Sequence, residues 1–155
     1  MSPRPQGFTL VELIMVILLI GILSAAGMSL FARSDAFSAL AARDRMMAMG
    51  LVAQKRALAN SGAGGAVTFT VAQSSSSFVF SVLQNSVLLA SDAISRSGLS
   101  LSLDGSAMVD GQTETISFAA DGSTGANRQW LFSGSQSRAF CQTSTGFLHD
   151  GNCQP

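Results

Sequence analysis

A single carboxylate stands in the longest apolar run of the chain. Residues 8–31 comprise 24 amino acids, and Glu12 is the only charged residue among them. An ionisable group costs free energy inside lipid, so it usually has a partner or lies where water reaches it. Glu12 is therefore either a hydrated group at the level of the lipid headgroups or a group that is neutralised by a partner.

Two cysteines and one histidine are the other residues that could do chemistry. Cys141, Cys153 and His149 all lie near the carboxyl terminus. In an oxidising compartment the two thiols should form a disulfide, and Gly146 and Gly151 allow the bends that the enclosed loop needs. Metal binding is the alternative, but a single histidine and two cysteines make a poor ligand set.

No set of nucleophile, base and orienting group can be recognised. His149 has no partner of this kind, so we expect a surface residue rather than a general base. The glycine-rich stretch 62–65 lacks the lysine and the strand–helix context of a phosphate-binding loop. We predict that the protein is not an enzyme, and that it has no cofactor and no metal.

The apolar run itself predicts a helix. At about 1.5 Å per residue, residues 8–31 are long enough to cross a hydrocarbon core of about 30 Å, so we predict a transmembrane helix. An alternative is an ordinary secretory signal cleaved near residue 26, after the small residues of Ser24-Ala25-Ala26. Glu12 within the apolar region counts against it.

The charges are divided unevenly between the two parts of the chain. Residues 1–59 carry a formal charge of +3 and residues 60–155 a charge of −3, so the total is zero. An acidic second part gives no electrostatic reason to bind nucleic acid. Arg4 near the amino terminus favours a cytoplasmic start and an exported remainder.

Residues 32–60 predict an amphipathic helix. Large apolar residues recur at heptad-like intervals at Phe37, Leu40, Met47, Leu51 and Leu58. We expect this stripe to pack against a sheet. The turn residues from Asn60 onwards should end the helix, and together with the apolar run we expect one helix from about Thr9 to Ala59.

Residues 61–155 predict β-structure. Short runs with alternating apolar residues are separated by turn signals, which is typical of an antiparallel sheet. The expected strands are 67–71, 78–82, 87–89, 99–103, 115–118, 129–132 and 139–141. The predicted fold class is α+β, with one long helix packed on an antiparallel sheet.

The amino-terminal sequence Gly7-Phe8-Thr9-Leu10-Val11-Glu12-Leu13 resembles the processing signal of type IV pilins and type II secretion pseudopilins. The resemblance implies that a prepilin peptidase removes residues 1–7, cutting between Gly7 and Phe8, and methylates the new amino group of Phe8. It implies that Glu12 pairs with the Phe8 amine of a neighbouring subunit. It also implies a bridged carboxy-terminal loop.

Further expectations follow from the same resemblance. The protein would sit in the bacterial inner membrane with its head in the periplasm before it joins a pilus or pseudopilus. Its partners would be the peptidase, other pilin or pseudopilin subunits, the inner-membrane assembly platform and the membrane, with no nucleic acid.

A second, shorter resemblance concerns residues 116–125 and Trp130-Leu131-Phe132. They are similar to the strand–turn–strand hairpin of H-type minor pseudopilins, and the layout is similar to minor prepilins of mannose-sensitive haemagglutinin pili. This favours a minor subunit that initiates or caps a filament. The alternatives are a pilus-tip binding module, as an adhesin or DNA-uptake pilin, and an ordinary secreted soluble protein.

Overall fold

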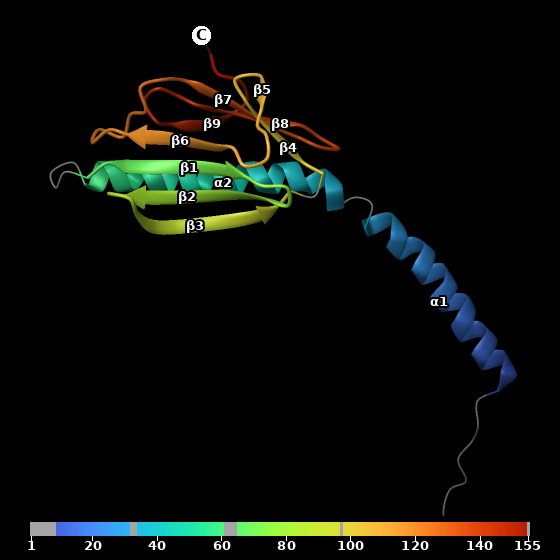
Figure 1. Cartoon of the computed structure of the whole chain (residues 1–155). Coiled ribbons are helices and arrows are strands. Elements are labelled where there is room, and N and C mark those ends of the chain that lie inside the picture. Colours follow the sequence, from blue (N-terminus) through green and yellow to red (C-terminus); the bar gives the residue numbers. More distant parts are fainter. Residues whose placement is uncertain (1–8, 32–33, 61–64, 97, 155) are drawn as a thin grey trace, which may run out of the picture. The chain divides into compact units, whose positions relative to one another are not determined.

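The computed structural model describes residues 9–31, 34–60, 65–96 and 98–154. The chain divides into two compact units, Met1–Ser34 and Asp35–Pro155. The first unit contains helix α1 (Leu10–Phe31), and the second contains nearly all of helix α2 (Ser34–Ala59) and the strands (Figure 1). We call the second unit the head.

The structure assigns two helices where the sequence predicts one helix over 9–59. Helix α1 ends at Phe31 and α2 begins at Ser34. Residues 32 and 33, through which the predicted helix would have to run, are not among those described. Helix α2 ends at Ala59, directly before the turn that the sequence places at Asn60.

Helix α1 shows no buried side chain between Leu10 and Ser24. Its large apolar residues in this range are 44–74% exposed, on all sides of the helix. Within the residues that the structure describes, no helix reaches both the length and the apolarity needed to cross a membrane.

The described part of the head contains nine strands in two antiparallel sheets, which confirms the predicted α+β class and its antiparallel head. One sheet has the order β3-β2-β1-β6 and the other has the order β5-β4-β7-β8-β9. The bounds are β1 (Val67–Gln73), β2 (Ser77–Gln84), β3 (Val87–Ser95), β4 (Ser100–Leu103), β5 (Ser106–Ala107), β6 (Thr113–Phe118), β7 (Arg128–Ser133), β8 (Arg138–Gln142) and β9 (Leu148–Asp150). The sequence did not predict β5 and β9, because strands of two and three residues are too short to show a period.

The expectation of a hairpin around Asp121-Gly122 is wrong. Strand β6 pairs with β1, whereas β7 pairs with β4 and β8 in the other sheet. Asp121-Gly122 does form a turn, in which the Gly122 N–H donates to the Ala119 carbonyl oxygen. The connection that contains this turn carries the chain from one sheet to the other instead of folding it back on β6.

One core joins both sheets to α2. Phe69, Phe78 and Phe80 fill it from the first sheet, and Trp130, Phe132 and Phe140 fill it from the second. The rings of Phe78 and Phe132 meet edge to face across the sheets, with centroids 5.6 Å apart. The aromatic bulk of the head therefore comes from the strands.

The face of α2 that packs into the core is not the one that the stripe of large apolar residues predicts. Small residues dominate the buried positions, which are Ala39, Ala42, Met46, Gly50, Ala53 and Ala57. By contrast Phe37, Leu51 and Leu58 are 64%, 42% and 50% exposed. Because aromatic rings from the strands already fill the core, the helix fits only where its own side chains are short. At Gly50 an added Cβ would lie 2.8 Å from Leu148 Cδ1.

Candidate functional site

Glu12 is held at the start of α1 by Thr9. The Thr9 backbone N–H donates to Glu12 Oε2 at 2.8 Å, and the Thr9 hydroxyl donates to the same oxygen at 3.0 Å. In return the Glu12 N–H donates to Thr9 Oγ1 at 3.3 Å. This reciprocal arrangement is a capping box, in which residues three apart satisfy N–H groups that the first turn of a helix leaves without partners.

The role of Thr9 was not predicted, although the sequence carries its signal. A threonine followed by a glutamate three positions later, directly before an apolar run, is the sequence pattern of a capping box. The capping box also shows that one oxygen of the Glu12 carboxylate, Oε2, already has a hydrogen-bond partner within its own chain. Among the described residues, Oε1 accepts no hydrogen bond, and the carboxylate is exposed.

Gly7 and Phe8, the predicted cleavage and methylation positions, precede the first described residue. The structure therefore does not test the cut, the methyl group or a pairing of Glu12 with a Phe8 amine. These three statements remain predictions.

The head holds the disulfide expected near its carboxyl terminus. Cys141 and Cys153 are bonded, with Cα atoms 4.9 Å apart. Cys141 lies in β8 within the core, and the Cys153 N–H donates to Gln129 Oε1 of β7. The bond therefore fastens the last residues of the described chain to the second sheet.

His149 lies inside the loop that the disulfide closes. Its Nδ1–H donates to the Asp150 carbonyl oxygen at 2.9 Å, and its ring stacks on Phe147 with centroids 6.3 Å apart. No group of three or more His, Cys, Asp or Glu side chains that could hold a metal occurs in the described part of the chain.

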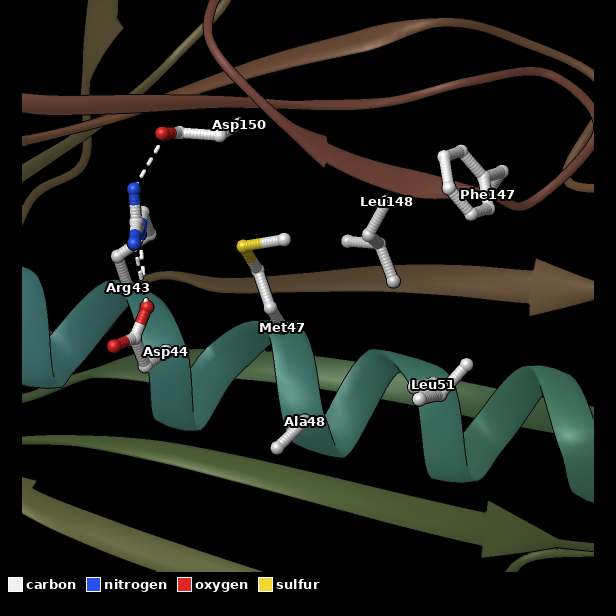
Figure 2. Close-up of a pocket in the computed structure, with 8 residues that line it drawn as sticks. All are labelled: Arg43, Asp44, Met47, Ala48, Leu51, Phe147, Leu148 and Asp150. Atoms are coloured by element: carbon white, nitrogen blue, oxygen red, sulfur yellow. Dashed lines mark hydrogen bonds and ion pairs between the residues drawn. The ribbon is translucent and has the colours of Figure 1, made fainter.

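A pocket opens between α2 and the disulfide-bonded loop (Figure 2). It has a volume of about 360 Å³. We call it the α2 pocket, and its lining residues are Arg43, Asp44, Met47, Ala48, Leu51, Phe147, Leu148 and Asp150. Apolar side chains from the helix and the loop face one another here, and charged groups stand at one end.

Arg43 links the two sides of the α2 pocket. Its guanidinium donates to Asp44 Oδ1 at 2.8 Å and to Asp150 Oδ1 at 2.5 Å. Partial burial disfavours the charge of Arg43, but the two carboxylates outweigh it and raise the pKa of the guanidinium above its usual value. Two carboxylates around one arginine leave this end of the pocket with an excess of one negative charge.

The comparison with known families concerns the amino terminus. Residues 3–28 match the family model described as the prokaryotic N-terminal methylation motif. The chain carries a methylation motif. No curated protein and no solved structure matches the chain.

The methylation motif supports the resemblance to type IV pilins and pseudopilins. It includes Gly7, Phe8, Thr9 and Glu12, and it continues into α1. It implies processing by a prepilin peptidase and assembly with other pilin subunits, and it points to a structural protein rather than an enzyme. The match ends at residue 28, before the head begins, so it does not cover any of the head.

Proposed function

We propose that the protein is a minor subunit of a type IV pilus or of a type II secretion pseudopilus, where it helps to initiate or cap the filament. The observation that carries the proposal is the methylation motif over residues 3–28, which includes most of α1, a helix whose described large apolar side chains are exposed on all sides. Such a helix lacks an apolar environment within its own unit. In this proposal the inner membrane surrounds residues 8–31 first, and neighbouring helices of the filament surround them after assembly.

Processing is the first part of the proposal. The peptidase removes residues 1–7 on the cytoplasmic side, and Phe8 becomes the methylated amino terminus. The head, which folds around its own aromatic core and is closed by the Cys141–Cys153 bond, is exported to the periplasm. A disulfide is compatible with that oxidising compartment.

Pairing of Glu12 is the second part. In the capping box, Thr9 engages one carboxylate oxygen, and the other oxygen is free to accept from a neighbour's Phe8 ammonium. A charge pair of this kind lets both groups stay ionised in an apolar environment where neither would be stable alone. Helix capping and subunit pairing can therefore use the same side chain.

The experiment separates these two roles of Glu12. Glutamine also serves at the third position of a capping box, so Glu12→Gln keeps the cap and removes the charge. Thr9→Val removes the capping hydroxyl and keeps the charge. We expect normal membrane association for both variants, but reduced recovery of Glu12→Gln in the filament fraction prepared from the native host.

Two results would count against the pairing. If Glu12→Gln enters filaments as well as the unmodified chain, the charge has no role in assembly. If Thr9→Val loses assembly while Glu12→Gln keeps it, Glu12 acts through the helix cap and not through its charge. Immunoblots of sheared filament and membrane fractions measure both outcomes.

A further inference from the structure

The exposed side of α2 carries opposite charges at two positions. Asp44 lies at the α2 pocket, in the first half of the helix, and Lys55 lies near its carboxyl end. Lys55 follows Asp44 by eleven positions, which is close to three full turns, so the two residues lie on nearly the same side of the helix. Leu51 and Leu58 flank Lys55 on that side, and both are substantially exposed.

The α2 pocket suits a partner that is apolar and positively charged. Met47, Leu51, Phe147 and Leu148 provide its apolar surface. The side chains of Asp44 and Asp150 remain 57% and 72% exposed although both contact Arg43. At about 360 Å³ the pocket is at the small end of the range for ligand sites, and its volume suits one or two side chains.

The basic end of α2 has the matching chemistry. Lys55 is exposed, and no ion pair joins it to any described residue. It cannot reach Asp44 of its own chain, because eleven residues of α-helix separate them by about 16 Å along the axis. An ion pair between these two residues therefore needs two chains.

We propose that the α2 pocket binds Lys55 and Leu58 from α2 of a second copy of this chain. Two parallel α2 helices offset by about 16 Å along their axes bring Lys55 of one copy beside Asp44 and Asp150 of the other. The offset also places Leu58 of one copy level with Met47 in the pocket of the other. The contact uses different surfaces on the two copies, so each pair keeps one unused pocket and one unused lysine. The inference rests on the proposed function, because it describes how the heads of filament subunits meet.

Cysteine crosslinking tests the offset in the full chain. Two differently tagged chains, one with Asp44→Cys and the other with Lys55→Cys, are produced together in the native host and oxidised mildly in membranes. We expect a mixed disulfide dimer, because the contact brings these positions together. Either variant alone should give little dimer, since like positions would be about 16 Å apart, too far for a disulfide.

Charge reversal tests the chemistry of the contact. In detergent, Asp44→Lys and Lys55→Asp should each weaken self-association by about three- to tenfold, the scale of reversing one exposed ion pair. The double variant should recover most of this loss. Glu114→Lys, which makes the same charge change on β6, is the matched control and should leave self-association unchanged. Sedimentation velocity over a range of concentrations measures the unmodified chain and the four variants.

Four results would overturn the inference. The first is absence of the mixed dimer, the second is crosslinking of like positions, and the third is a double variant as weak as its parents. The fourth is a chain that stays monomeric at all concentrations, in which case the pocket has another occupant. The mass of the mature amino terminus, measured on the same samples, keeps the two proposals apart. A chain that starts at methylated Phe8 but does not crosslink would contradict only the contact.

Discussion

Helix α1 and the head differ in whether their large apolar side chains are exposed or buried within the unit. The large apolar side chains described in α1 are exposed, whereas the head buries the aromatic side chains of its strands and turns small residues of α2 inward. The head carries its own core, and α1 depends on an apolar environment that other molecules must supply. Changes in the head should therefore alter folding, and changes near the start of α1 should alter processing and assembly.

The largest expected effect comes from the aromatic core. Phe80→Ala should destabilise the head by about 3–5 kcal/mol, because it leaves a cavity among buried rings. Phe37→Ala is the matched control on the exposed side of α2 and should change stability by no more than about 0.5 kcal/mol. The single tryptophan, Trp130, is buried, so its fluorescence reports denaturant unfolding. Equal losses in the two variants would contradict the inward and outward faces described above.

The disulfide should have the next largest effect. Cys153→Ser removes the bond that fastens the carboxy-terminal loop to β8 and should cost about 3 kcal/mol in the loop-entropy model. We expect a lower melting temperature with secondary structure retained by circular dichroism. Reductant should destabilise the unmodified chain and leave Cys153→Ser unchanged. A reductant-sensitive variant would show that the bond is not the source of the difference.

Two glycines near the carboxyl terminus differ in how closely other backbone atoms approach them. Gly146 and Gly151 both have a positive φ, of 83° and 92°. A Cβ at Gly146 would lie 2.0 Å from the Gly122 carbonyl oxygen, whereas a Cβ at Gly151 would meet nothing within 4 Å. Gly151→Ala should therefore cost about 1–2 kcal/mol of backbone strain, and Gly146→Ala should cost more because the backbone itself must move. Similar unfolding midpoints for the two variants would argue against this close approach.

The smallest expected effect is on the stability of the head at low pH. Hydrogen bonds from the Ser123 hydroxyl and backbone N–H lower the pKa of Asp121 below its usual value. The stabilisation is present above the pKa of the unfolded chain, near 3.9, and is lost as the pH falls through the lower folded value. Asp121→Asn should therefore lose less stability between pH 7 and pH 3 than the unmodified chain. Urea midpoints at the two pH values measure this, with Glu114→Gln as control, and an unchanged acid response would contradict it.

The sequence predicts the class of each region well, because class depends on local patterns. The alternation in residues 67–71 and 78–82 gave β1 and β2, and Asn60 marked the end of α2. The choice of which helix face turns inward was wrong, because it depends on how much space the aromatic strands leave. The pairing of β6 and β7 was also wrong, because a turn signal at Asp121-Gly122 does not say which sheet the next strand joins.

Only part of the candidate site could be predicted from the sequence, because only part of it depends on residues that are neighbours in the chain. The motif around Gly7, Phe8 and Glu12 is local, so the sequence shows it directly. The α2 pocket combines residues 43–51 with residues 147–150, which are distant in the chain, and only the fold brings them together. The capping role of Thr9 could have been found from the sequence, since its partner lies three residues away.

The amino terminus of the mature protein tests the central claim most directly. Intact-mass analysis of the chain recovered from membranes of the native host should give residues 8–155 with one added methyl group and one disulfide. Gly7→Val should leave uncut chain that begins at Met1, which links the cut to the Gly7–Phe8 junction. A mature chain that starts near Gly27, or an unmodified chain that keeps residues 1–7, would contradict the assignment as a filament subunit.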